Sequence, residues 1–153
     1  MKITTSVACA PQYVWENFGE SLFQKLVPPF PKARLLEFGG NEKGARVAIE
    51  LNFLLFKQKW VSDITDNGRE GDGFYFVDEG SELPFFIKKW KHRHVIVEGE
   101  NGGAKIIDDV SFQSHGKLMT WFFTPLIWLQ FVYRKPIYKR VFGEKAKATS
   151  SPR

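Results

Sequence analysis

Two histidines on one short segment are the residues of this chain whose types and spacing could do acid–base chemistry. In residues 89–94, Lys-Trp-Lys-His-Arg-His, three cations alternate with Trp90, His92 and His94. On a β-strand, successive side chains point to opposite faces, and three neighbouring cations belong in water. The spacing therefore predicts that Trp90 and both histidines point into the protein.

A carboxylate on the following segment is placed to meet these histidines. In residues 104–113, Asp108 alternates with polar positions and shares a face with apolar residues. The intervening loop 99–103, Gly-Glu-Asn-Gly-Gly, is a strong hairpin signal. Any register that keeps both inner faces consistent sets Asp108 opposite or diagonal to His92 or His94.

Three interpretations of this inward His–Asp pair compete. In the first, Asp108 orients a core histidine and stabilises the sheet, because buried polar groups need hydrogen bonds. In the second, His92, His94 and Asp108 are the polar anchor of an apolar pocket and bind a headgroup or carboxylate. In the third, they are catalytic and act as acid and base on a carbonyl substrate. A metal site ranks last, because His-x-His on a strand is a weak signal, so we expect no metal and no cofactor.

The element that must cover these residues is the segment 117–142, which carries no charge from Leu118 to Tyr133. A helix that is apolar on most of its circumference must be buried on more than one side. The sequence therefore predicts a long helix held by a curved antiparallel sheet, with kinks at Pro125 and Pro136. Read with a 3.6-residue period, one apolar face contains Leu118, Phe122, Leu126, Leu129, Tyr133 and Ile137.

Two other interpretations of this helix involve a membrane. A spanning helix needs about 20 apolar residues, and this apolar run is shorter and ends at charged residues. A helix that lies flat on a membrane is the stronger alternative, because a basic end suits anionic headgroups. The basic end contains Arg134, Lys135, Lys139, Arg140, Lys145 and Lys147.

The rest of the chain reads as one strand, two short helices and a series of further strands. The first helix begins at Pro11, which is well suited to a first helical position. The turn signal Asp66-Asn67-Gly68 is expected to end one strand. Segregated helices and antiparallel strands predict an α+β fold, with residues 1–142 as a single domain and 143–153 as a polar, disordered tail. The expected strands are 2–9, 33–38, 45–53, 57–65, 73–79, 85–98 and 104–113, about seven in all.

Composition restricts the function further. The net charge is +5 in 153 residues, but the basic residues are spread along the chain, so we expect no nucleic-acid partner. The single cysteine gives no disulfide framework, and the first residues lack an apolar segment of signal-peptide length, which favours a cytoplasmic protein. The aromatic content of 16% suits the walls of an apolar pocket.

The order of elements resembles the helix-grip superfamily of START-related proteins, also called SRPBCC, which includes pollen-allergen-type carriers and polyketide cyclase-like proteins. Two motifs carry the resemblance: Ala-Pro-Gln-Tyr-Val-Trp-Glu-Asn-Phe at 10–18, and a Trp-x-His-x-His strand at 90–94 followed by a turn. The second is similar to a bacterial subfamily in which Gly-Thr-x-x-x-Asp-x-Val-x-Tyr follows. This chain departs from that pattern at Ala104 and Phe112, where two hydroxyls are missing.

The resemblance implies a deep cavity between the sheet and the last helix that holds a hydrophobic or amphipathic molecule. The leading hypothesis is a non-enzymatic carrier of such a molecule, lipid-like or polycyclic. One alternative is a cyclase, dehydratase or hydrolase that uses the His–Asp pair, and another is a membrane-associated or dimeric module that presents Trp121, Trp128 and Phe131 outward. The expected cavity lining is Phe53, Trp60, Phe74, Phe76, Trp90, His92, His94, Asp108, Phe112, Phe122, Leu126, Leu129 and Tyr133.

Overall fold

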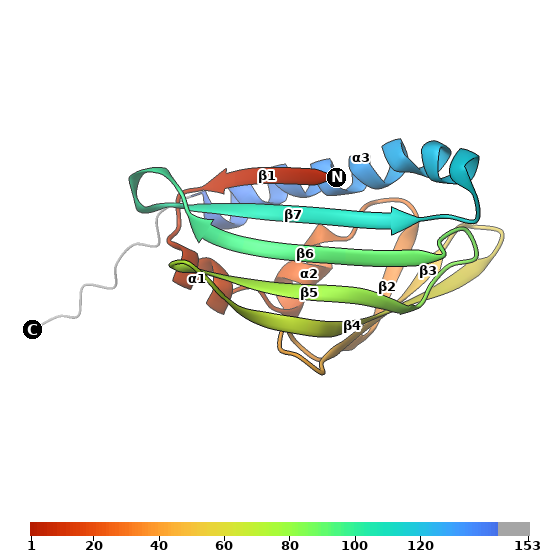
Figure 1. Ribbon diagram of the computed structural model, residues 1–153, viewed down its shortest axis with the longest axis horizontal. Coiled ribbons are helices and arrows are strands. Elements are labelled where there is room, and N and C mark those ends of the chain that lie inside the picture. The colour runs from red at the N-terminus through yellow and green to blue at the C-terminus, as the bar shows by residue number, and fades with distance from the viewer. Residues whose placement is uncertain (144–153) are drawn as a thin grey trace, which may run out of the picture.

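A computed structural model describes residues 1–143 of the chain as one curved sheet with three helices behind it (Figure 1). The seven strands are antiparallel and follow the order β1-β7-β6-β5-β4-β3-β2. The tail prediction for 143–153 lies outside the described residues except for Gly143. The elements are β1 (Lys2–Val7), α1 (Pro11–Glu16), α2 (Glu20–Leu26), β2 (Lys32–Phe38), β3 (Arg46–Asn52), β4 (Lys57–Glu70), β5 (Gly73–Glu82), β6 (Lys89–Glu98), a short 3-10 turn (Glu100–Gly102), β7 (Ala104–Gln113) and α3 (Lys117–Phe142).

This architecture confirms the predicted α+β fold, with its long C-terminal helix and two short helices after the first strand. Helix α1 begins at Pro11, as expected for a residue without a free N–H. The hairpin between β6 and β7 turns at Asn101 and Gly102, both with positive φ. Helix α3 runs continuously past both Pro125 and Pro136.

Two boundary predictions are wrong. The sequence Asp66-Asn67-Gly68 does not end a strand, because a bulge near Ile64 lets β4 continue to Glu70, where Gly71 makes the turn. Within the continued strand, Asp66 accepts a hydrogen bond of 3.0 Å from the Tyr75 hydroxyl. Strand β6 begins at Lys89 rather than at residue 85, because residues 83–88 form a loop after β5.

Two apolar clusters lie between the sheet and the helices. One joins α1 and α2 to β5, β6, β7 and the end of α3, where Tyr138 and Phe142 are fully buried. The other lies under the middle of α3, where Ile127 and Phe131 pack against Trp90 and Val110. The strands contribute every second side chain to these clusters, and α3 contributes side chains that are one or two helical turns apart.

The C-terminal end of α3 is hydrogen-bonded to the segment that follows β1. The carbonyl oxygen of Phe142 accepts hydrogen bonds from the backbone N–H groups of Ala8 and Cys9, at 3.0 and 3.1 Å. These bonds satisfy one of the carbonyls that every helix leaves open at its C-terminal end. The last turn of α3 is thereby fixed to the segment that connects β1 to α1.

No helix within residues 1–143 is long and apolar enough to cross a membrane.

Candidate functional site

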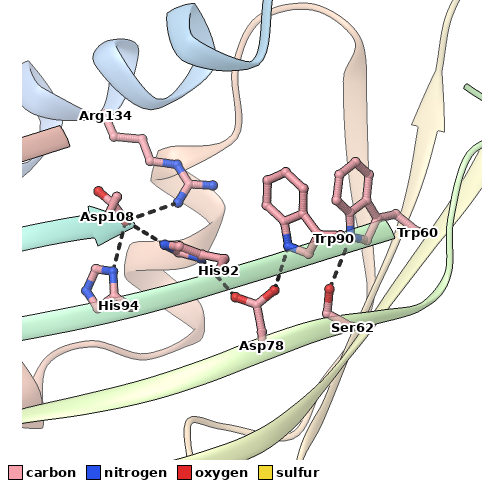
Figure 2. A network of polar contacts seen from close by, with 8 residues as sticks. All are labelled: Trp60, Ser62, Asp78, Trp90, His92, His94, Asp108 and Arg134. Atoms are coloured by element: carbon pink, nitrogen blue, oxygen red, sulfur yellow. Dashed lines mark hydrogen bonds and ion pairs between the residues drawn. The ribbon is translucent and has the colours of Figure 1, made fainter. Parts of the chain in front are cut away.

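The histidines and aspartates of three adjacent strands form one buried network, shown in Figure 2. In the strand register, His94 of β6 lies opposite Asp108 of β7, and His92 lies opposite Asp78 of β5. His92 Nδ1 is 2.8 Å from Asp78 Oδ2, and His92 Nε2 is 2.9 Å from Asp108 Oδ1. His94 Nδ1 is also 2.9 Å from Asp108 Oδ1. We call Asp78, His92, His94, Asp108 and the nearby Arg134 the His–Asp network.

His92 is held in its charged form. Both ring nitrogens face carboxylates, which only accept hydrogen bonds, so each nitrogen carries a proton and donates. Burial alone would lower the pKa of His92, but the charge of Asp78 and the hydrogen bond to Asp108 outweigh it and raise this pKa to about 9. Asp78 is fixed in turn by the Trp90 indole N–H, which donates to its other oxygen at 2.8 Å.

His94 differs from its neighbour, because it is neutral. Its side chain is 0% exposed. Burial lowers the pKa of His94 more than the attraction of Asp108 raises it, and the charge of His92 adds to the lowering. Because Nδ1 donates its proton to Asp108, Nε2 of the neutral ring is a bare acceptor.

Asp108 is the centre of the network. Burial would raise its pKa, but hydrogen bonds from both histidines and the positive charge of His92 hold the pKa of this carboxyl well below its usual range. Nη1 of Arg134 in α3 lies 4.0 Å from Asp108 Oδ1. The guanidinium carbon of Arg134 lies over the Phe131 ring, 4.2 Å from the ring centre. Two anions, Asp78 and Asp108, thus balance two cations, His92 and Arg134, in the interior.

Three polar atoms of this region are buried without a hydrogen-bond partner among the described residues. They are His94 Nε2, Asp108 Oδ2 and the Tyr138 hydroxyl oxygen. The rings of Tyr138 and His94 are 6.4 Å apart. Burial and the charge of Asp108 raise the pKa of Tyr138, so its hydroxyl keeps its proton. Buried polar atoms without partners are rare in proteins, and they mark places where water or a ligand completes the structure.

The same donors could hold a cation only after rearrangement. One ligand atom from each of His92, His94 and Asp108 lies within 4.8 Å of the others. However, both nitrogens of His92 and Nδ1 of His94 already donate protons to carboxylates, so their lone pairs are not available. The arrangement suits proton sharing better than metal binding.

The predicted inward orientation of Trp90, His92, His94 and Asp108 is confirmed. All four side chains are buried, and the His–Asp contacts form in the expected register. Other residues expected to line a cavity are packed in the two cores: Phe74 and Phe76 belong to the cluster near His94, and Trp60 and Phe112 to the cluster around Trp90. Phe53 lies in the β3–β4 loop beside Phe56 and Phe86.

Four residues of α3 lie elsewhere than predicted. Phe122, Leu126, Leu129 and Tyr133 are exposed, because they occupy the side of the helix turned away from the sheet. The side turned toward the sheet carries Ile127, Phe131, Tyr138 and Phe142. Both sides of this helix are apolar, so periodicity did not identify the buried one.

Two hollows of the described surface lie outside the His–Asp network. One has a volume of about 330 Å³ and is lined by residues of β2 and β3 with Lys57. The other has a volume of about 600 Å³ and is apolar; it is lined by Met1 and by residues between Trp121 and Trp128 of α3. Neither hollow is lined by a residue of the network.

Three important residues were missed by the sequence analysis. Asp78 shares the strand parity of the apolar Phe74 and Phe76, and this alternation is a signal that could have identified it as inward-facing. Arg134 was assigned to the basic end of the helix, but it turns inward to Asp108. Tyr138 stands between Ile137 and Lys139 near the basic end of the helix, and nothing in the sequence marks it as buried.

A curved antiparallel sheet wrapped around a long C-terminal helix, with two short helices after the first strand, defines the helix-grip fold of the START-related proteins. No protein-family model and no curated protein matches the sequence. The fold is shared with solved structures. Truncated norcoclaurine synthase from Thalictrum flavum has 13% identity and a TM-score of 0.65, over 95% of this chain and 94% of that chain.

Two bacterial structures are similar to the same degree. Protein Ms6760 from Mycobacterium smegmatis has 16% identity and a TM-score of 0.64, over 92% of this chain and 88% of that chain. The Zhui aromatase/cyclase from Streptomyces sp. R1128 has 14% identity and a TM-score of 0.62, over 99% of this chain and 98% of that chain. The structural similarity shows the fold, and the subfamily with the Trp-x-His-x-His strand stays a prediction.

Proposed function

We propose that the protein binds a small hydrophobic or amphipathic molecule between the sheet and α3, with the polar end of the molecule at His94, Asp108 and Tyr138. The observation that carries this proposal is the set of three buried polar atoms without partners in an otherwise aromatic and aliphatic interior. A ligand whose polar group reaches these atoms would supply the missing hydrogen bonds, and its apolar part would contact the surrounding rings.

The chemistry of these atoms selects the polar group of the ligand. His94 Nε2 and Asp108 Oδ2 are both acceptors, so they require a donor. A hydroxyl or amine can donate to them, whereas a carboxylate can only accept and would be repelled by Asp108. The proposed ligand is therefore an apolar molecule that carries a hydroxyl, such as an alcohol or a phenol, rather than the carboxylate considered from the sequence.

The first part of α3 is the route by which such a ligand would enter. Within the described helix, none of residues 117–126 is buried, although most of them are apolar. Pro125 lies near the end of this stretch and lacks the N–H that would hold the preceding turn. Movement of this half-helix about Pro125 would open the space above Trp90 and Phe131 while the second half stays fixed by Tyr138 and Phe142.

The names of two proteins with the same fold support a small-molecule site. One is a norcoclaurine synthase and the other an aromatase/cyclase. The fold hosts both carriers and enzymes, so the site rather than the fold must decide between them.

Replacing Tyr138 by phenylalanine tests the ligand site. The Tyr138 hydroxyl is buried without a hydrogen bond, so its removal should leave the stability of the empty protein unchanged or slightly higher. If the hydroxyl contacts a ligand, the same change should weaken binding of the probe decan-1-ol about tenfold, which corresponds to the loss of one hydrogen bond. Isothermal titration calorimetry with decan-1-ol and decanoate measures this effect, and the wild-type protein should prefer the alcohol.

The control is Tyr133→Phe, which removes an exposed hydroxyl from the same helix. It should change neither stability nor binding. A wild-type protein that binds neither probe, and that carries no co-purified molecule in native mass spectrometry, would refute the proposed function. Equal binding by wild-type protein and Tyr138→Phe would place the ligand elsewhere.

A second candidate function is acid–base catalysis, and the opposite pKa shifts of the two histidines favour it. His92 is charged at neutral pH and His94 is neutral, which is how paired groups become an acid and a base. A neutral His94 could remove a proton next to a carbonyl group. In D₂O, the protein should then catalyse deuterium exchange beside the carbonyl of 2-decanone, followed by NMR, and His94→Gln should abolish the exchange. Exchange at the rate of the protein-free solution would exclude this reaction for that class of ketone.

A further inference from the structure

Exposed apolar side chains gather at one end of the molecule. The β3–β4 loop, the β5–β6 loop and the start of α3 meet there, at the right of Figure 1. Aromatic contacts connect the three segments: the rings of Phe56 and Phe85 are 6.0 Å apart, and those of Phe86 and Phe123 are stacked at 4.7 Å. We call this surface the apolar tip; its exposed members are Leu54, Leu55, Phe56, Phe85, Leu118, Trp121 and Phe122.

The β3–β4 loop is built to present its leucines to the outside. Leu55 is 94% exposed and Leu54 is 77% exposed. Leu54 has a φ of 74°, a left-handed conformation that costs a residue other than glycine about 1 kcal/mol or more. The loop is nevertheless held in place, because Asn52 Oδ1 accepts from the Leu54 N–H at 2.9 Å and the Phe56 carbonyl accepts from the Phe53 N–H at 2.9 Å. Strain of this kind is kept where a conformation has a use.

The segments that form the apolar tip carry basic charges only. The sequence contains no aspartate or glutamate in residues 53–57, 83–91 or 113–142. Lys88, Lys89 and Lys117 adjoin the tip and are exposed. Lys57 also adjoins it and is paired with Glu50 at 3.1 Å. An apolar surface with a basic border matches the arrangement of an anionic bilayer, in which acyl chains lie beneath negative headgroups.

We propose that the apolar tip is a docking surface for an anionic lipid bilayer. Leu54, Leu55 and Phe85 enter the boundary between headgroups and acyl chains, and Trp121, which is 74% exposed, lies at the same level on α3. The lysines of the border contact the headgroup phosphates. This surface differs from the membrane contact considered from the sequence, in which α3 lies flat on the membrane and uses its basic C-terminal end. Arg134 of that end faces Asp108 instead.

Charge decides between a bilayer and a second copy of the chain. In a symmetric dimer the same patch faces itself, so Lys88, Lys89 and Lys117 of the two copies would lie in one interface and repel one another. The net charge of +5 would add to this repulsion. An anionic bilayer has the complementary charge, and it covers all the exposed apolar side chains of the tip together.

Flotation with lipid vesicles tests the proposal on the full chain and needs no ligand for the interior site. The wild-type protein should bind vesicles of phosphatidylcholine with 30% phosphatidylglycerol at least tenfold more strongly than vesicles of phosphatidylcholine alone. The double variant Leu54→Ser/Leu55→Ser should lose at least tenfold in binding to the anionic vesicles, because it loses two of the three most exposed leucines. Raising the salt concentration from 0.1 to 0.5 M should weaken wild-type binding.

Two control variants separate the apolar tip from the rest of the surface. Leu36→Ser removes an exposed leucine of β2, and Lys25→Gln removes an exposed lysine of α2; both should bind anionic vesicles like the wild-type protein. Lys88→Gln/Lys89→Gln should weaken binding, in contrast to Lys25→Gln. Absence of wild-type binding to anionic vesicles would overturn the proposal. Self-association in gel filtration that is lost in Leu54→Ser/Leu55→Ser, without vesicle binding, would assign the surface to a second copy instead.

Discussion

Replacing Asp108 by alanine is expected to lower the free energy of unfolding by about 3–5 kcal/mol, the usual effect of removing one member of a buried ion pair. Asp108 is 1% exposed and accepts hydrogen bonds from His92 and His94, and Arg134 lies nearby. Without it, His92 and Arg134 place two positive charges in the interior with only Asp78 to oppose them. Urea denaturation followed by tryptophan fluorescence measures the loss.

The neighbouring residue provides a matched control. Asp109 lies on the same strand but points to the outer face and is exposed. Asp109→Ala should change the free energy of unfolding by less than about 0.5 kcal/mol. If both variants lost the same stability, the charges of the network would not be coupled through Asp108. Because Asp108 is so important for stability, Tyr138 is the better residue with which to examine ligand binding.

Raising the pH from 6.5 to above 9 should destabilise the protein by about 3 kcal/mol through His92. The pKa of His92 is about 9 in the folded protein against 6.5 for a free histidine side chain, so the folded state holds the proton more tightly. This stabilisation is fully present below the unfolded pKa of about 6.5 and is lost as the pH rises through the folded pKa of about 9. Each pH unit between 6.5 and 9 should lower the free energy of unfolding by about 1.4 kcal/mol. Urea denaturation at a series of pH values measures the slope.

Two histidine variants identify the source of this slope. His92→Gln should be less stable at pH 6.5 and should show a flatter dependence up to pH 9. His115→Gln removes an exposed histidine and should keep the wild-type dependence. A wild-type protein with constant stability from pH 6.5 to 9 would show that His92 is not held in its charged form.

The stability should also fall on the acidic side, for the opposite reason. The pKa of His94 is lowered in the folded protein, chiefly by burial, so below about pH 6.5 the unfolded chain takes up a proton that the folded protein refuses. The lowered pKa of Asp108 acts in the same direction at still lower pH. The two histidines together therefore place the highest stability near pH 6.5, a consequence of one being charged and the other neutral.

The sequence was sufficient for the fold because its local signals agree with each other. The turn at Asn101 and Gly102 fixed the hairpin of β6 and β7, and alternation of cations with Trp90, His92 and His94 fixed which face is buried. Register then followed, and with it the contact between His94 and Asp108. The hairpin, its buried face and its register all follow from short-range geometry, because the strand period and the turn residues allow few alternative pairings.

The remaining parts depend on contacts between distant segments. Helix α3 is apolar on both sides, so only the position of the sheet decides that Phe131 is buried and Leu129 exposed. Asp78 meets His92 only because β5 pairs with β6 in the register that sets these two residues opposite each other. Arg134 faces inward because Asp108 offers a counter-charge, which no pattern within α3 can reveal.

The hydrogen bonds from Ala8 and Cys9 to the carbonyl of Phe142 bear on how the protein is made. During translation, the segment after β1 emerges from the ribosome long before its partner in the last helical turn. Strand β1 also waits for β7, which follows it by about a hundred residues. These contacts can therefore form only after almost all of residues 1–142 have left the ribosome. Pairing between residues so far apart in the sequence is slow to form. Removal of the last turn of α3 should accordingly leave nascent chains that engage chaperones rather than a shortened native domain.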